Sequence, residues 1–183
     1  LVEGRAKGRS QMPSMGGQIR YPLLHASHVA EDLMGLLEPW CERLAIAGSI
    51  RRRKPDVGDI ELLAIPRWGQ ARDLWGKDLN PLQEVSLLDL SVVHLIKIGL
   101  LDYRLDAKGH RSFGPLNKLL VHVASGIPVD LFSTTVRNYG MALLVRTGPK
   151  EFNVRIMTRF RELGMAGHAY GGVTVNAAQV DCP

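Results

Sequence analysis

The chain has few of the features that mark secreted or membrane proteins. It contains only two cysteines, Cys41 and Cys182, among 183 residues, which excludes a disulfide framework and favours a reducing compartment. It has no apolar run of transmembrane length, no signal-peptide pattern, no repeat and no low-complexity tract. We therefore expect an intracellular protein of the cytoplasm or nucleoid that does not act at a membrane, and a viral origin fits as well. We also expect it to be a monomer.

The balance of charge favours a polyanionic partner. Lys and Arg number 23 against 18 Asp and Glu, giving a net charge of +5, and basic proteins bind nucleic acid in a salt-sensitive way. Residues 1–20 are polar, basic and rich in glycine, which predicts a flexible arm. Such a moderate excess of charge is also common in proteins that never meet nucleic acid, so the motifs must decide.

Residues 48–61 are the most informative segment. A Gly-Ser turn and four successive basic residues precede Asp59 and Glu61, which flank Ile60 in an apolar stretch. Because side chains alternate along a strand, both acids should share one face while Ile60 points into the core. Adjacent carboxylates repel unless a cation lies between them, and the basic turn suits a phosphate. The segment therefore predicts metal-binding carboxylates beside a phosphate site, as two-metal nucleotidyl transfer requires.

Each half of this segment also has a simpler interpretation. Asp-x-Glu occurs in many solvated strands, and Gly-Ser followed by basic residues is commonly just a loop. Here the flanking residues 44–47 and 60–65 both read as buried strands. The two acids would then lie against the hydrophobic core, which favours the metal site over a solvated strand.

A third carboxylate, Asp130, lies in the middle of the short apolar stretch 127–132. Residues 119–123 predict a strand before it, and residues 124–126 predict a hairpin turn between the two. An aspartate inside such a strand is costly to bury without a partner. Either a salt bridge to one of the many arginines or a shared metal ion would meet this need, and we favour the metal ion.

The remaining pattern predicts an α+β fold, a mixed sheet with helices packed on it. Apolar residues recur at helical spacing over 25–44, a stretch that Pro39 should kink or divide, and over 82–98. Residues 136–146 and 150–163 predict two further helices, joined at a Thr-Gly-Pro turn.

Together these motifs resemble the palm of family X DNA polymerases, the relatives of polymerase beta. The matching motifs are Gly-Ser-x-Arg-Arg at 48–52, Gly-Asp-Ile-Glu at 58–61, Val-Asp-Leu-Phe at 129–132, and the Thr-Gly turn at 147–148 with Asn153 beyond it. The first two motifs alone would indicate only the wider nucleotidyltransferase superfamily. The Thr-Gly turn with Asn153 narrows the resemblance to family X. The resemblance covers residues 24–167 and implies a nucleotidyltransferase palm over 21–135 and a small thumb-like subdomain over 136–183.

The resemblance implies a role for each matched residue. Asp59, Glu61 and Asp130 would hold two Mg²⁺ or Mn²⁺ ions, and Asp130 would accept the proton of a primer 3′-hydroxyl. The phosphates of the incoming nucleotide would be contacted by Gly48, Ser49 and Arg52. Its sugar and base edge would be contacted by Gly148 and Asn153.

DNA contacts are expected from three basic residues. Arg155 and Arg159 lie one helical turn apart on a shared face, close to Met157, where relatives often carry an arginine toward the template. Lys118 precedes the predicted hairpin and is either a phosphate contact or a solvated lysine.

Two further departures from the family pattern concern the site itself. Glu61 stands where many relatives carry aspartate, and Val145 and Arg146 replace an aromatic pair that packs against the sugar in several relatives. The resemblance therefore predicts neither sugar selectivity nor fidelity nor strict template dependence.

The ends of the chain bear on the expected architecture. Family X repair enzymes usually carry an amino-terminal lyase domain and a helix-hairpin-helix clamp, and the palm motif here begins at Gly48. The chain starts at Leu1 and stops at Pro183, where the thumb would normally continue. Two interpretations follow: a minimal polymerase like the small viral members, or a chain with an incomplete thumb and missing terminal pieces.

The sequence thus predicts a DNA-directed DNA polymerase that fills gaps during DNA repair. It would transfer dNMP from a dNTP to the primer 3′-hydroxyl of gapped or primer-template DNA and release pyrophosphate. One alternative is a nucleotidyltransferase that acts on a small molecule or protein, which the Thr-Gly and Asn block disfavours. Another is a non-catalytic DNA-binding module, which three retained carboxylates disfavour.

Overall fold

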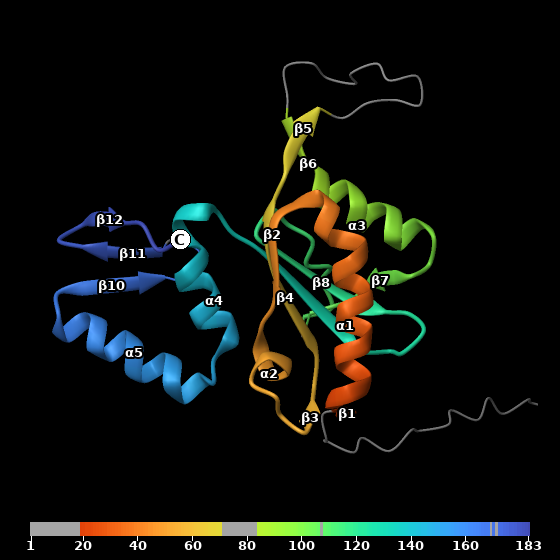
Figure 1. Cartoon of the computed structure of the whole chain (residues 1–183), viewed down its shortest axis with the longest axis horizontal. Helices are drawn as coiled ribbons and strands as arrows, with labels where there is room; N and C mark the ends of the chain where they lie inside the picture. Colours follow the sequence, from red (N-terminus) through yellow and green to blue (C-terminus); the bar gives the residue numbers. More distant parts are fainter. Residues whose placement is uncertain (1–18, 71–83, 107, 169, 171) are drawn as a thin grey trace, which may run out of the picture.

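A five-stranded mixed sheet forms the centre of the structure (Figure 1), a computed structural model that describes residues 19–70, 84–106, 108–168, 170 and 172–183. The second and third strands of the sheet run parallel, and all other neighbours are antiparallel. In spatial order the strands are β2 (Cys41–Ile46), β4 (Ile60–Pro66), β9 (Pro128–Ser133), β8 (Asn117–His122) and β7 (Leu101–Tyr103). A mixed sheet flanked by helices confirms the predicted α+β class.

One face of the sheet is covered by α1 (Leu23–Leu37) and α3 (Leu87–Lys97). Both helices bury one apolar stripe at helical spacing, and that stripe packs on alternate residues of β4, among them Ile60 and Leu62. The predicted break at Pro39 is confirmed, because α1 ends at Leu37 and a 3-10 turn, η1 (Glu38–Trp40), leads into β2. The helical pattern is wrong for residues 41–44, which pair with β4 as part of β2.

Helix α3 is shorter than the pattern over 82–98 predicted. Ser86 caps its first turn, and its hydroxyl accepts a hydrogen bond from the Asp89 backbone N–H at 3.1 Å. The preceding residues form β6 (Glu84–Ser86), which pairs with β5 (Trp68–Gln70).

The opposite face of the sheet is covered in part by α4 (Tyr139–Thr147), which follows the 3-10 turn η2 (Val136–Asn138). Tyr139 of α4 packs near Leu63 and Phe132 in a second, smaller cluster. Because side chains alternate along strands, Glu61 and Asp130 lie on this same face. The sheet therefore turns its apolar face to α1 and α3 and its acidic positions toward α4.

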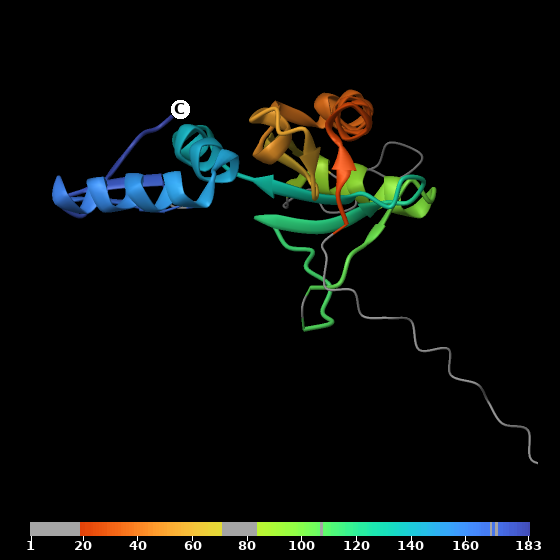
Figure 2. The ribbon, with the colours of Figure 1, turned by 90° about the horizontal axis from the view of Figure 1, so that it is seen from below.

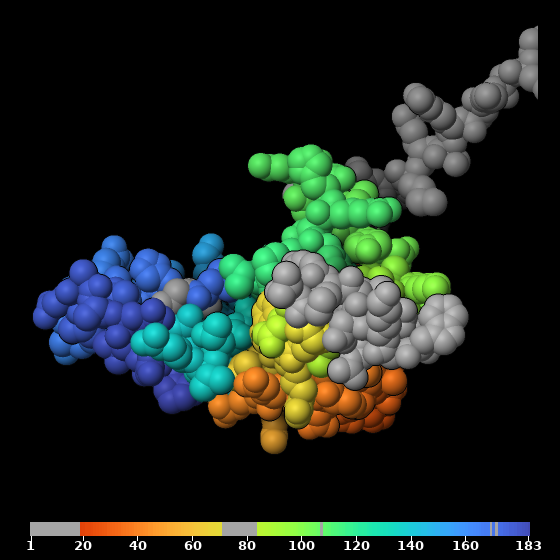
Figure 3. Space-filling model, turned by 90° about the horizontal axis from the view of Figure 1, so that it is seen from above, coloured from red at the N-terminus to blue at the C-terminus, as the bar shows by residue number. Residues whose placement is uncertain are grey.

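The C-terminal elements form a lobe beside the sheet, joined to it through α4 (Figures 2 and 3). The lobe consists of α5 (Lys150–Glu162) and a three-stranded antiparallel sheet of β10 (Met165–His168), β11 (Gly172–Val175) and β12 (Ala178–Val180). No residue of α5 is buried. The two predicted helices over 136–146 and 150–163 are present, with their junction at Gly148 and Pro149, but residues 136–138 of the first form the 3-10 turn η2.

Two short elements complete the part of the chain that can be described. β1 (Tyr21–Pro22) pairs with β3 (Asp56–Val57), and the single-turn helix α2 (Gly48–Arg51) follows β2. Most of the predicted arm, residues 1–18, lies outside the described residues. Among the helices that are described, none has both the length and the apolar character needed to cross a membrane.

Candidate active site

The three predicted carboxylates converge at one place on the sheet. Glu61 of β4 is in register with Asp130 of β9 in the parallel pair, and Asp59 lies directly before β4. Ile60 between the two acids is fully buried in the core, so the predicted alternation is confirmed. Asp59, Glu61 and Asp130 therefore occupy neighbouring positions on the face that α4 shares.

Burial makes these carboxylates hard to ionise. It raises the pKa of Glu61 to about 7, and repulsion from Asp59 and Asp130 adds to the effect. It raises the pKa of Asp130 to about 6, against the opposing charge of Arg104. The pKa of Asp59 is raised by burial as well. The cluster thus holds more negative charge than its surroundings compensate, which suits a proton or a cation.

Asp130 is not free within this cluster. One Nη2–H of Arg104 donates to its Oδ1 in a close ion pair, so the salt bridge to an arginine that the sequence left open is present. Within the described ranges, no three acidic, histidine or cysteine side chains are already arranged as a metal-binding group. The donor set still fits Mg²⁺ or Mn²⁺, since buried carboxylate oxygens that repel one another are ligands these ions prefer.

The turn before β4 presses against the acids. Gly48 has a φ of +59°, and a β-carbon there would collide with the Glu61 carboxylate. Ser49 is buried, and its hydroxyl has no hydrogen-bond partner among the residues the structure describes. An unpartnered buried donor beside a basic turn suits an anionic ligand.

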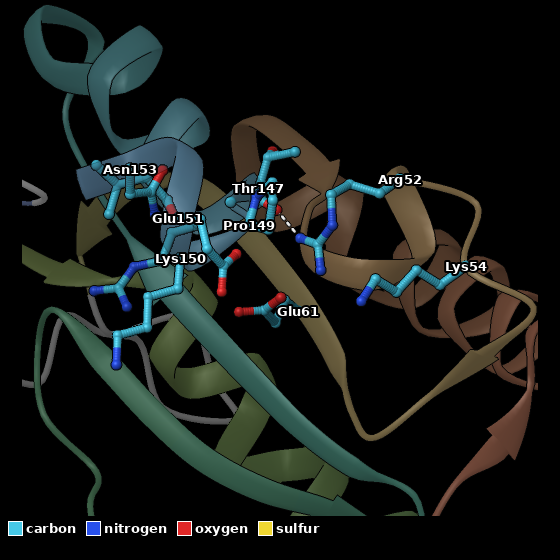
Figure 4. A pocket seen from close by; sticks show the side chains of 11 residues that line it. Arg52, Lys54, Glu61, Thr147, Pro149, Lys150, Glu151 and Asn153 are labelled. Carbon is cyan, nitrogen blue, oxygen red and sulfur yellow. Dashed lines mark hydrogen bonds between the residues drawn. The ribbon is translucent and has the colours of Figure 1, made fainter. Parts of the chain in front are cut away.

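A pocket of about 410 Å³ opens beside Glu61 (Figure 4). Arg52 and Lys54 lie on one side of it, Lys150 lies on the other, and Glu61 lies between them. The lining residues are Arg52, Lys54, Glu61, Val145, Arg146, Thr147, Gly148, Pro149, Lys150, Glu151 and Asn153. Four of the predicted site residues, Arg52, Glu61, Gly148 and Asn153, are thus brought together in one cavity.

Arg52 joins the turn before β4 to the end of α4 at this pocket. Its Nη1 donates to the Thr147 carbonyl at the end of α4. Gly148 has a φ of +67°, and a β-carbon there would lie 3.2 Å from Arg52 Nη1. Asn153 donates to the Val145 carbonyl at 2.8 Å. The Thr-Gly turn is therefore built around the arginine that the sequence assigned to phosphate.

Two arginines at the site had no functional role in the sequence interpretation. The guanidinium of Arg146 lies 3.6 Å from the ring centroid of Phe132 and 4.7 Å from that of Tyr170. Burial raises the pKa values of Glu61 and Asp130, and the charge of Arg146 opposes that rise. The position of Arg146 directly before the Thr-Gly turn was a usable signal, whereas Arg104 lies in no motif.

The basic residues predicted to contact DNA differ in their placement. Arg155 and Arg159 are exposed on α5, where Arg159 pairs with Glu162 at 2.9 Å. The prediction for Lys118 is wrong, because its side chain is fully buried. Its ammonium lies 2.8 Å from Asp89 and donates to the Gly114 carbonyl at 3.0 Å, so it cannot reach a phosphate.

In comparisons with known proteins, no family model matches the chain, and no curated protein matches it significantly. The resemblance to family X therefore stays a prediction from the sequence motifs.

Proposed function

We propose that the protein is a nucleotidyltransferase, a gap-filling DNA polymerase that adds dNMP from a dNTP to a primer 3′-hydroxyl and releases pyrophosphate. The observation that carries the proposal is the position of Glu61, which belongs both to the acidic cluster and to the basic pocket. Phosphoryl transfer needs both parts side by side, since catalysis consists mostly of positioning and charge neutralisation.

The residues divide the work by their chemistry. Asp59, Glu61 and Asp130 would hold Mg²⁺ or Mn²⁺, which when bound neutralises phosphate charge and lowers the pKa of the attacking hydroxyl. Arg52 and the buried Ser49 hydroxyl donate hydrogen bonds to phosphate oxygens.

The pocket and the carboxylates position the two reactants. The exposed ammonium groups of Lys54 and Lys150 add positive charge on both sides of the pocket. Gly148 and Asn153 form the wall against which the sugar and base lie. The Asp130 carboxylate accepts the proton of the primer hydroxyl.

A second candidate is a non-catalytic DNA-binding module. The ion pair between Arg104 and Asp130 favours it, because a carboxylate held by an arginine is satisfied without a metal. The excess of positive charge on the chain suits both candidates.

The test is nucleotide addition to a duplex with a single-nucleotide gap, with Mg²⁺ or Mn²⁺ and each dNTP separately. The native chain is compared with Asp130→Ala and with Glu42→Gln, a change at an exposed acid of β2. Addition of the templated base, lost in Asp130→Ala and kept in Glu42→Gln, supports the proposal. Untemplated addition indicates a terminal transferase. DNA binding without any addition supports the non-catalytic module.

A further inference from the structure

Arg104, Asp130 and Glu61 lie in one row across the sheet. The Arg104 backbone N–H donates to the Leu119 carbonyl at 3.0 Å, Leu119 of β8 is in register with Asp130, and Asp130 is in register with Glu61. Neighbouring strands are about 4.8 Å apart, so the backbones of Arg104 and Asp130 are separated by two strand spacings. A long side chain is needed to span that distance, and the Arg104 guanidinium reaches Asp130.

The contact engages only one end of the guanidinium. Nη2 donates to Asp130 Oδ1, whereas Nε is buried and has no hydrogen-bond partner within the part of the chain that is described. The Arg104 side chain is 32% exposed and that of Asp130 is 17% exposed. Arg104 is therefore held to the cluster by a single carboxylate, and it retains a route to solvent.

Arg104 also acts on the rest of the cluster. Of the charges that favour ionised Asp59, that of Arg104 has the largest effect. A divalent cation bound by Asp59 and Asp130 would lie beside this guanidinium, and like charges at such short range repel strongly where solvent is partly excluded. The guanidinium and a divalent cation thus compete for the same oxygen atoms.

We propose that Arg104 is a positioning residue that holds Asp130 in the metal-free protein and must leave it before Asp130 can bind a divalent cation. This inference depends on the metal site of the proposed function. Arg104 opens the segment between β7 and β8, which protrudes from the body of the molecule (Figure 3). Because the Arg104 side chain is 32% exposed, the guanidinium can turn toward solvent without moving the strands. The consequence is a higher cation concentration for half-occupancy than the carboxylates alone would require.

The test is a titration of the full chain with Mn²⁺, followed by electron paramagnetic resonance, at about pH 8 where carboxyl groups are ionised. Arg104→Gln removes the charge and keeps a polar side chain. We expect it to bind Mn²⁺ about 10-fold more tightly than the native chain. Arg104→Lys keeps the charge on a shorter reach and should give an intermediate affinity.

The matched control is Arg111→Gln, which removes an equal charge from the same protruding segment. Arg111 packs over the Tyr103 ring at 4.7 Å rather than on an acid, so its loss should leave Mn²⁺ affinity within about twofold of the native value. Circular dichroism of each variant establishes that it is folded. If Arg104→Gln does not fold, the Arg104→Lys affinity decides the matter.

Asp130→Asn separates failure of this inference from failure of the proposed function. If Mn²⁺ binding requires Asp130 but is unchanged or weaker in the Arg104 variants, the inference is overturned and the metal site stands. If the native chain and Arg104→Gln both show no Mn²⁺ binding that depends on Asp130, the metal site and this inference fall together.

Discussion

Gly48 and Glu61 are packed so closely that position 48 has no space for a β-carbon. The turn that precedes the site and the acid at its centre are thus shaped to each other. The φ of +59° at Gly48 adds a backbone reason for glycine at the same position. The Gly-Ser turn and the acid pair, neighbours in sequence, form one unit in space.

Gly48→Ala should therefore both destabilise the protein and displace Glu61. The strained backbone and the collision together should lower the free energy of unfolding by about 2 kcal/mol or more. Denaturant unfolding measures this. Gly35→Ala is the matched control, because no atom lies within 4 Å of a β-carbon at that position in α1. It should raise stability by up to about 1 kcal/mol, and equal effects of the two changes would contradict the packing argument.

Glu61→Gln should change how stability depends on pH. The pKa of Glu61 is raised from 4.5 to about 7, so between these values the folded protein binds a proton that the unfolded chain has released. The free energy of unfolding should then fall as the pH rises from 4.5 to 7 and stay low above it. Glu61→Gln removes the contribution of Glu61 to this fall, while the raised pKa values of Asp130 and Asp59 leave a smaller fall in place. The variant should be more stable than the native chain at alkaline pH, by about 2 kcal/mol.

Denaturant unfolding in a chelator, on the acidic and alkaline sides of this window, measures the effect. Glu42→Gln, at an exposed acid, serves as the control. A Glu61→Gln protein that is less stable than the native chain in alkali would show that burial does not disfavour the ionised carboxylate.

Arg52→Ala should weaken nucleotide binding. The arginine lines the pocket and donates to the Thr147 carbonyl, so its loss removes a hydrogen-bond donor from the proposed phosphate site and a link to the end of α4. We expect the Kd for a dNTP to rise about 10-fold or more. Isothermal titration calorimetry measures it, with Arg53→Ala as the matched control. Arg53 is exposed, adjacent and equally charged, and an equal loss in both variants would reduce the effect to general electrostatics.

DNA affinity should depend on α5 and not on Lys118. A protein with Arg155→Ala and Arg159→Ala loses two exposed cations, so the slope of log affinity against log salt should become shallower by about 1 to 2. Lys118→Met should leave that slope unchanged, because the buried ammonium never faces solvent. Fluorescence anisotropy with gapped DNA compares them. A slope reduced by Lys118→Met and untouched by the α5 changes would reverse this assignment.

Local patterns in the sequence predicted one part of the site correctly. The alternation of Asp59, Ile60 and Glu61 follows from the two-residue period of a strand, and the break at Pro39 follows from its missing backbone N–H. These features need no knowledge of distant residues.

The contacts that the sequence did not predict are those between distant residues. The Arg104–Asp130 pair arises from a row of three strands, and no spacing along the chain encodes that row. Lys118 lies on β8, and its buried charge is explained by Asp89 on α3 and by the Gly114 carbonyl. The contact with Asp89 joins residues that are far apart in the sequence. Strands β10 to β12 likewise carry no strong alternation and depend on one another for pairing.

The parallel pairing of β4 with β9 has a consequence for how the protein folds. Glu61 and Asp130 become neighbours only after the whole crossover between them, including α3 and the β7–β8 pair, has been laid down. Such long-range contacts form late, since closing a large loop costs entropy before the pairing repays it. In a chain emerging from the ribosome, Asp59 and Glu61 therefore lie at the edge of the β2–β4 pair before Asp130 is present. The acidic cluster is complete only when β9 has joined the sheet.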